Sequence, residues 1–257
     1  MSNSNKDIAN AKRIVVKVGS SSISGANAGK IDALVAALAA SHARGCEVIL
    51  VSSGAIATGL PLFSLASRPD DLPTSQALAA VGQSRLIARY QDQLEKFGII
   101  AGQVLLTSGD LEAEETRANA KRAMDRLLEL RVLPIVNEND TVATAEIRFG
   151  DNDRLAALVA VLVEADALVL LSDVDALYDM PPTKPGAKRI ERVAFGEDLS
   201  SVEVGGSSSA VGTGGAVTKV GAAKLATESG VSVLLTSTDN VAAALEGQSV
   251  GTWFESE

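Results

Sequence analysis

Cysteine, histidine and aromatic residues are all scarce in this sequence of 257 residues. Cys46 is the only cysteine, which excludes an intrachain disulfide and fits a reducing compartment such as the cytosol. The only histidine, His42, lies within an expected helix, where we interpret it as a solvated bystander. Because no cysteines and histidines have the spacing of metal ligands, the sequence excludes a structural zinc site. Aromatic residues make up 3% of the chain, so aliphatic side chains must fill the core.

Long apolar runs and a positive net charge are also missing. No run reaches the roughly 18 residues that a membrane span needs, and the start, MSNSNKDIANAKR, has no apolar signal segment. We therefore expect a cytoplasmic protein with no membrane partner. The formal net charge is −9, which argues against general attraction to nucleic acid. An anionic ligand would have to be held by a few locally placed cations and backbone N–H groups.

Short β-branched segments alternate with longer segments, rich in alanine and leucine, that have a helical period. Several of the short segments are apolar on both faces, as is typical of strands covered by helices on both sides. The alternation predicts an α/β fold with a doubly wound, mainly parallel sheet sandwiched by helices. We expect a solvated or disordered N-terminus over residues 1–12 and a single domain over 13–257, with an N-terminal lobe that ends near residue 165. The expected strands are 14–18, 47–53, 98–106, 132–136, 167–172 and 231–237.

Two segments interrupt this alternation. Residues 59–74 are rich in proline and turn-forming residues, and residues 178–211 combine prolines, charges and a glycine- and serine-rich run. Loops of this length in a compact domain usually form lids or binding loops, or are disordered. We predict a long surface loop in each segment.

The ends of the first two strands carry small residues suited to ligand binding. Open parallel sheets bind ligands beyond the carboxyl ends of their strands. Lys17 lies near the end of the first strand, and Gly19 and the two serines after it could present consecutive N–H groups to a phosphate. Ser53 and Gly54 open a similar turn after the second strand. The alternative for each is an ordinary turn, with the ammonium group of Lys17 simply reaching solvent.

The fourth strand is followed by a dense set of carboxylates and amides. Residues 137–141 read Asn-Glu-Asn-Asp-Thr and include Asp140. After a short strand-like stretch at 146–149, Asp151, Asn152 and Asp153 open a helix. One of these side chains could serve as a helix N-cap, but a cap needs one such residue and not three. This pattern favours a functional site.

Two later segments suit a nucleotide. Ser172 and Asp173 follow the fifth strand in a polar turn. Residues 212–219 form a glycine-rich segment that runs into a helix, and Lys219 lies in its first turn. Glycines allow close approach of the backbone to a ligand, and a helix N-terminus favours anions. The segment matches neither the P-loop nor the dinucleotide-binding pattern, and a flexible loop is the alternative.

Together these segments resemble the amino acid kinase family. The matching stretches, in the family's order from Arg13 to about Phe254, are IVVKVGSS, LVSSGAIATG, AVGQSRLIARY, PIVNENDTVATAEIRFGDND, LVLLSDVDALY and VGTGGAVTKVGAAKLA. SSGAI, NENDTVATAEI and GDND are most similar to the branch of the family that phosphorylates L-glutamate. The resemblance therefore implies ATP-dependent phosphorylation of the side-chain carboxylate of L-glutamate, the first step of proline biosynthesis, with Mg²⁺ carried by ATP.

The resemblance also implies roles for individual residues. Lys17 and Lys219 would hold the ATP phosphates and offset charge on the transferring phosphoryl group, and Asp151 and Asp153 would shape the glutamate pocket and orient the lysines. The implied glutamate contacts are Ser53, Gly54, Asp140, Asp151 and Asn152. Besides Lys17, the implied ATP contacts are Gly19, Ser172, Asp173, Thr213, Gly214, Gly215, Ala216, Val217, Thr218 and Lys219.

This assignment agrees with the chemistry of the reaction. A carboxylate oxygen is already a nucleophile and needs no general base, so catalysis reduces to alignment and charge stabilisation. Acidic residues near the amino acid would bind its ammonium group. Arg148 stands where a lysine is frequent in the family, and its role is open.

The resemblance extends to partners. It implies a homo-oligomer, and it raises proline as a feedback inhibitor and a glutamyl phosphate reductase as a partner, because an acyl phosphate is labile in water. Many bacterial relatives carry a C-terminal RNA-modification-type domain, which we do not expect in this chain. Two alternatives stay open: a related kinase for another carboxylate such as N-acetylglutamate, and an inactive amino-acid sensor with the same fold.

Overall fold

The computed structural model describes residues 6–63, 65, 69, 71–142, 152–199, 202 and 215–257. The helices there are α1 Lys6–Asn10, α2 Lys30–Ala43, α3 Ala55–Gly59, α4 Leu72–Glu95, α5 Ser108–Glu112, α6 Glu114–Glu129, α7 Asn152–Leu162, α8 Ala216–Thr227 and α9 Val241–Leu245. The strands are β1 Arg13–Val18, β2 Glu47–Ser52, β3 Ala101–Leu106, β4 Leu133–Glu138, β5 Ala167–Ser172, β6 Leu177–Tyr178, β7 Arg189–Ile190, β8 Arg192–Val193, β9 Ser232–Ser237 and β10 Thr252–Phe254. Short 3-10 helices are η1 Ser20–Ser22, η2 Gly25–Asn27, η3 Leu60–Phe63 and η4 Thr238–Asn240.

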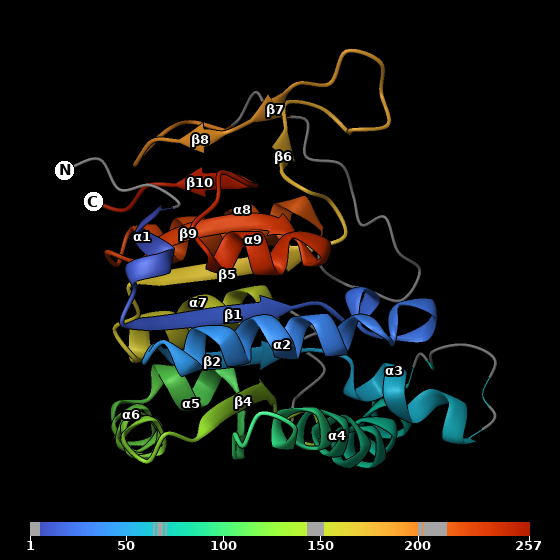
Figure 1. The fold of residues 1–257 in the computed structure, drawn as a ribbon. Coiled ribbons are helices and arrows are strands. Elements are labelled where there is room, and N and C mark those ends of the chain that lie inside the picture. Colours follow the sequence, from blue (N-terminus) through green and yellow to red (C-terminus); the bar gives the residue numbers. More distant parts are fainter. Residues whose placement is uncertain are drawn as a thin grey trace.

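Within this described part, the main sheet has eight strands in the order β3-β4-β2-β1-β5-β9-β10-β8 (Figure 1). Strands β1 to β5 and β9 are parallel, β10 is antiparallel to β9, and β8 is parallel to β10. Strands β6 and β7 form a separate antiparallel pair. The predicted α/β fold with a mainly parallel sheet is confirmed. The strand order reverses direction at β1, between β2 and β5, and open α/β sheets bind ligands at such a switch point.

The sheet separates two hydrophobic cores, and alternation along β1 distributes its side chains between them. Ile14, Val16 and Val18 belong to the core that also contains side chains of α1, α2, α4 and α9. Val15 belongs to the other core, with side chains of α5, α6, α7 and α8. Because side chains two residues apart in a strand share a face, Lys17 points to the same side as Val15. The lysine is thereby directed toward α7 and α8.

The predicted loop at 59–74 is wrong at both ends. Residues 60–63 form the 3-10 helix η3, and α4 already begins at Leu72. The Oδ1 atom of Asp71 accepts a hydrogen bond from the backbone N–H of Thr74 at 2.9 Å, and Pro73 lies in the first turn. Proline is compatible with the first turn of a helix, because the backbone N–H groups of that turn have no acceptor within the helix. A proline-rich composition was therefore mistaken for a loop where it marks a helix start.

The predicted loop at 178–211 also contains strands. The backbone of β7 pairs with β6, and β8 adds to the edge of the main sheet. The glycine- and serine-rich run at 204–212 and the expected strand at 146–149 lie outside the described residues.

His42 is not the solvated bystander that the sequence predicted. It lies in the last turn of α2, half-buried, and its Nε2 atom is 3.1 Å from the backbone carbonyl oxygen of Arg131. Arg131 has a φ of 59° and its guanidinium donates back to the carbonyl of His42. The two residues therefore connect the end of α2 to the turn before β4.

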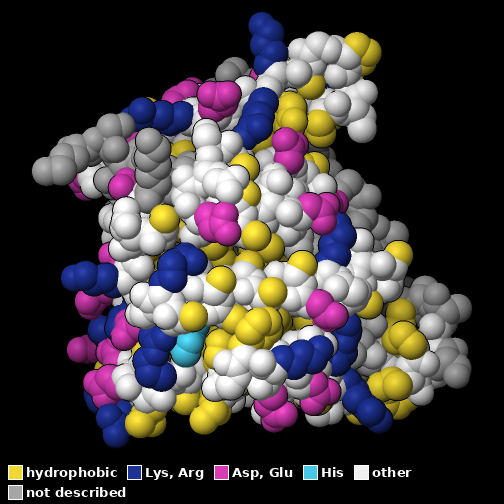
Figure 2. Space-filling model, viewed as in Figure 1, with side chains coloured by type: hydrophobic (Ala, Val, Ile, Leu, Met, Phe, Trp, Pro, Cys, Tyr) yellow, Lys and Arg dark blue, Asp and Glu magenta, His cyan; other side chains and the backbone are white. Residues whose placement is uncertain are grey.

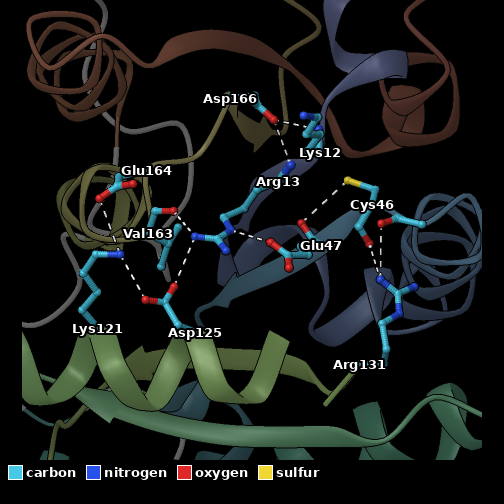
Figure 3. Close-up of polar contacts among 11 residues, drawn as sticks. Lys12, Arg13, Cys46, Glu47, Lys121, Asp125, Arg131, Val163, Glu164 and Asp166 are labelled. Atoms are coloured by element: carbon cyan, nitrogen blue, oxygen red, sulfur yellow. Dashed lines mark hydrogen bonds and ion pairs between the residues drawn. The ribbon is translucent and has the colours of Figure 1, made fainter. Parts of the chain in front are cut away.

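An ionic network centred on Arg13 lies at the amino ends of the strands (Figure 3). The Nε atom of Arg13 is 2.7 Å from Oε2 of Glu47, and Nη1 is 3.3 Å from Oδ1 of Asp125. The carboxylate of Asp166 accepts hydrogen bonds from the backbone N–H groups of Lys12 and Arg13. This network connects the starts of β1, β2 and β5 with α6. It lies at the amino ends of the strands, opposite to the carboxyl ends singled out in the sequence.

Cationic and anionic side chains are intermixed on the face shown in Figure 2, with hydrophobic side chains between them. No single-sign charge covers this face. Among the described residues, none of the helices has the length and apolar character needed to cross a bilayer.

Candidate active site

Three charged side chains from separate elements meet at the carboxyl ends of the central strands. The Nζ atom of Lys17 on β1 is 2.5 Å from Oδ1 of Asp153, and Nζ of Lys219 on α8 is 3.0 Å from Oδ2. All three residues are buried, with exposed fractions of 4%, 1% and 8% for Lys17, Asp153 and Lys219. One carboxylate thus connects two lysines that lie far apart in the sequence.

The fold explains this convergence. Lys17 points toward α7 and α8, as alternation along β1 requires. Asp153 lies in the first turn of α7, and Lys219 in the first turn of α8. The hydroxyl of Thr218 also contacts Oδ2 of Asp153 at 2.8 Å and the carbonyl oxygen of Gly215 at 2.9 Å. The starts of two helices and the end of one strand therefore share a single anchoring carboxylate.

Asp153 remains ionised in this environment. Burial alone would raise the pKa of its carboxyl group. The positive charges of Lys17 and Lys219, together with hydrogen bonds from Lys17 and Thr218, outweigh burial and lower the pKa from 3.8 to about 2. The three charged side chains then carry one more positive than negative charge, so the cluster favours an anionic group such as a phosphate.

A second, uncharged cluster lies next to the first because Asn152 precedes Asp153 in the same helical turn. The Nδ2 atom of Asn152 is 2.8 Å from Oγ of Ser53 and 3.1 Å from Oδ1 of Asn137. Asn137 in turn donates from Nδ2 to Oε1 of Gln83 at 2.6 Å. The first turn of α7 therefore connects an amide cluster to the lysine cluster.

Two glycines bring α4 close enough to join this cluster. A Cβ atom at Gly82 would lie 1.8 Å from the carbonyl oxygen of Ala55, and one at Gly59 would lie 2.2 Å from that of Leu78. Only glycine fits at either position, so the backbones of α3 and α4 are in contact where the two helices cross. Gln83, next to Gly82, thereby reaches Asn137 at the end of β4.

Gly54 forms the turn between β2 and α3. It has a φ of 108°, which residues with a side chain rarely adopt, and its Cβ position would be 3.5 Å from the Cβ atom of Ser20. The turns after β1 and β2 therefore lie side by side. Gly19, in the first of these turns, lies close to the ammonium group of Lys17, with Nζ 3.8 Å from the position of an added Cβ.

The turn after β5 is polar and partly exposed. The hydroxyl of Ser172 donates to Oδ1 of Asp173 at 3.1 Å, and Asp173 is exposed. In the parallel sheet this turn lies on the β5 side of Lys17, since β5 is the neighbour of β1. The start of α8, with Gly215, Ala216 and the exposed Val217, carries Lys219 into the cluster.

The structure thus brings together six of the residues singled out in the sequence. Ser53, Asn152, Asp153, Thr218, Lys17 and Lys219 are joined by the contacts above. Asp140 lies in the turn after β4, at the same edge of the sheet. Asp151, Thr213 and Gly214 lie outside the described residues, as does Arg148.

Sequence reasoning missed Gln83 and Tyr90, and it assigned no role to Asn137. Gln83 and Tyr90 lie within α4 rather than at a strand end, so the search of strand ends could not find them. The hydroxyl of the fully buried Tyr90 is 2.9 Å from Oγ of Ser52, the residue before Ser53. Burial raises the pKa of this phenol, which keeps its proton. The sequence offers no local signal for either residue, because their positions depend on how α4 packs against the strand ends.

Comparison with known proteins identifies close relatives. Glutamate 5-kinase of Clavibacter sepedonicus is 70% identical over 247 residues, which cover 96% of this chain and 95% of that protein. Glutamate 5-kinase of Leifsonia xyli subsp. xyli is 66% identical over 248 residues, 96% of this chain and 92% of that protein. Glutamate 5-kinase of Streptomyces avermitilis is 54% identical over 260 residues, 99% of this chain and 69% of that protein.

A solved structure shares the fold at low sequence identity. Carbamate kinase from Giardia lamblia bound to AMP-PNP superposes with a TM-score of 0.69 at 17% identity, and the match covers 97% of this chain and 100% of the other. The sequence profile of the amino acid kinase family matches residues 12–237. With this match over most of the chain and these relatives, the chain belongs to the amino acid kinase family.

Proposed function

We propose that this chain transfers the γ-phosphoryl group of ATP to the side-chain carboxylate of L-glutamate, giving L-glutamate 5-phosphate and ADP, the first step of proline biosynthesis. The relatives named glutamate 5-kinase, at 66% to 70% identity over nearly the whole chain, carry the choice of substrate. The cluster of Lys17, Asp153 and Lys219 supports the type of reaction, because phosphoryl transfer to a carboxylate requires charge stabilisation and alignment.

In this proposal the two lysines act on the transferring group. Negative charge spreads over the phosphoryl oxygens in the transition state, and donors fixed in a water-poor site stabilise that charge better than donors in water. Lys17 and Lys219 are buried and held in place by Asp153. Asp153 is then a positioning residue for both ammonium groups, and no side chain has to accept a proton from the substrate carboxylate.

ATP binding is assigned to the β5 and α8 side of the cluster. We propose that Ser172, Asp173 and the segment from Thr213 to Lys219 contact the nucleotide, with Gly19 beside its phosphates. The start of α8 supports this assignment because a helix N-terminus favours phosphate.

Mg²⁺ fits this site as an ion carried by the nucleotide. Among the described residues, no group of three or more His, Cys, Asp or Glu side chains is placed to hold a metal ion. Magnesium usually keeps several waters and binds through substrate phosphates and one or two carboxylates. When bound, it would offset charge on the β- and γ-phosphates.

Glutamate binding is assigned to the β2 and β4 side. We propose that Ser53, Gly54, Asp140, Asp151 and Asn152 contact the amino acid, within an N-terminal lobe that ends near residue 165. Asn152 and Asp153 occupy successive positions of α7, so glutamate and the phosphoryl group would bind next to each other.

Hydroxamate trapping tests the proposed reaction directly. The purified chain is incubated with ATP, Mg²⁺, hydroxylamine and either L-glutamate, N-acetylglutamate or L-aspartate. We expect γ-glutamyl hydroxamate and ADP in equal amounts with L-glutamate. Turnover with only N-acetylglutamate or aspartate would refute the substrate assignment. Glutamate binding in calorimetry without any turnover would identify an inactive sensor.

The expectations about partners remain proposals with simple tests. A homo-oligomer would elute from size-exclusion chromatography at a multiple of 26.4 kDa. Inhibition by proline should raise the concentration of glutamate needed for turnover. A glutamyl phosphate reductase would be tested by co-elution with this chain.

A further inference from the structure

Three buried amide side chains form a chain of hydrogen bonds that ends at the proposed glutamate site. Gln83 of α4, Asn137 of β4 and Asn152 of α7 have exposed fractions of 8%, 1% and 4%. Asn137 donates to Gln83 with an Nδ2–Oε1 distance of 2.6 Å, and Asn152 donates to Asn137 with an Nδ2–Oδ1 distance of 3.1 Å. These hydrogen bonds thus connect the helix crossing at Gly82 with the first turn of α7.

Backbone groups fix which way these amides face. The backbone N–H of Glu138 donates to Oδ1 of Asn137 at 2.9 Å, and an N–H group cannot accept. Oδ1 of Asn137 must therefore face this N–H, which turns its Nδ2 toward the acceptor Oε1 of Gln83. Gln83 and Glu138 together hold Asn137 in a single orientation.

The orientation of Asn152 follows from that of Asn137. Nδ2 of Asn152 faces Oδ1 of Asn137, and it also lies 3.4 Å from the carbonyl oxygen of Ser52, which can only accept. Turning the amide of Asn152 over would place its oxygen against these two acceptors. The Oδ1 atom of Asn152 therefore points away from both.

That oxygen is buried without a hydrogen-bond donor among the described residues. An acceptor left unsatisfied in a buried position is unfavourable, so a donor is expected from the ligand. The substrate proposed above has one strong donor, its ammonium group, and two carboxylates that can only accept. If Asn152 faced the opposite way, its amino group would oppose the ammonium group.

We propose that Gln83 is a positioning residue for substrate binding. By holding Asn137, it keeps Asn152 oriented with Oδ1 as the acceptor for the ammonium group of the amino acid. This inference rests on the proposed function, because it takes glutamate as the ligand. It predicts that Gln83, in the middle of α4, affects the affinity for the amino acid. The affinity for the nucleotide should not depend on Gln83.

Two substitutions at Gln83 distinguish the effect of its hydrogen-bond acceptor from the effect of its side-chain volume. Q83M keeps the length of the side chain but removes the acceptor for Asn137, whereas Q83E keeps an acceptor. We expect Q83M to raise KM for glutamate about tenfold, the factor that one hydrogen bond corresponds to, and to leave KM for ATP unchanged within about twofold. Q83E should recover most of the affinity for glutamate.

Gln93 offers a matched control on the same helix. Its Oε1 atom accepts a hydrogen bond from Lys96 at the surface, at 2.6 Å. Q93M makes the same chemical change outside the cluster and should leave both KM values unaltered. If Q83M does not fold, Q83L serves as the second apolar variant, and thermal unfolding reports the fold of each.

A further readout concerns the ammonium group itself. Glutarate keeps both carboxylates of glutamate and lacks that group, so its inhibition constant should change less than twofold in Q83M. Equal weakening of glutamate and glutarate, parallel increases of both KM values, or an unchanged KM for glutamate in Q83M would overturn the inference. Absence of glutamate phosphorylation by the wild-type chain would instead refute the proposed function.

Discussion

Asp153 and Lys17 form a buried ion pair, with 2.5 Å between Oδ1 and Nζ, at the point where the strand order of the sheet reverses. The other oxygen of the same carboxylate holds Lys219 at 3.0 Å. Displacing either lysine therefore disturbs the carboxylate of Asp153 that also holds the other lysine. This arrangement connects the stability of the fold with the geometry of the proposed phosphoryl-transfer site.

Replacing Asp153 by asparagine should affect both stability and turnover. D153N keeps the shape of the side chain but leaves two buried ammonium groups without their common counter-charge. Removing one partner of a buried ion pair typically costs about 3–5 kcal/mol. We expect a loss of this size in urea unfolding and a large decrease in kcat. D92N, a change at an exposed acid of α4, is the control, and equal behaviour of the two variants would contradict this account.

Acid should weaken the contribution of Asp153 within a defined pH range. Its pKa in the folded chain is about 2, below the ordinary value of 3.8, so the folded state binds the proton less tightly than the unfolded state. The contribution, about 2 kcal/mol, is therefore complete above pH 3.8 and is lost as the pH falls toward 2.

Unfolding free energies of the wild type and D153N, measured across this range, provide the test. The difference between the two proteins should shrink as the pH falls below the ordinary pKa of the carboxyl group. A difference that is the same at pH 3 and pH 7 would show that the ionisation of Asp153 does not contribute.

The crossing of α3 and α4 should not tolerate a methyl group at Gly82. In G82A the new Cβ atom would be 1.8 Å from the carbonyl oxygen of Ala55, so the helices must separate. Overpacking of this kind usually costs about 1–3 kcal/mol. Because Gln83 moves with α4, we also expect a higher KM for glutamate.

Gly221 provides the matched control for this prediction. An added Cβ atom there meets nothing within 4 Å, and the residue lies inside α8. G221A should be neutral or stabilising by up to about 1 kcal/mol, because alanine has the higher helix propensity. If G82A proved as stable as G221A, the inference that α3 and α4 are in backbone contact at Gly82 would be wrong.

The network at the opposite edge of the sheet should affect stability alone. R13M removes the contacts of Arg13 with Glu47 and Asp125 and a hydrogen bond to the carbonyl of Val163. We expect a loss of about 1–3 kcal/mol, since partly buried charged groups lose their partner. KM values for both substrates should not change. R126M, which removes an exposed pair with Glu129, should cost less than about 1 kcal/mol.

The sequence was most informative where function depends on strand ends. Lys17 and Asp153 could be placed at one edge because parallel strands all present their carboxyl ends there. Glycine-rich turns and helix starts marked the positions around Gly54 and Lys219. Local pattern and sheet geometry together were sufficient for these residues.

It was least informative where two helices determine the position of a side chain. Gln83 reads as one more polar residue of an amphipathic helix, and its role depends on how closely Gly82 lets α4 approach α3. The contact between His42 and Arg131 depends on the packing of α2 against the turn before β4. Such pairs join residues distant in the sequence, and periodicity within one helix does not reveal them.

The most direct test of the account is the turnover of K17M and K219M with ATP and L-glutamate, measured by hydroxamate formation on proteins whose thermal unfolding shows them to be folded. The account predicts that each variant loses about 100-fold or more in kcat, the effect of removing one fixed donor from a transition-state site. A kcat within about threefold of the wild type for either variant would contradict it.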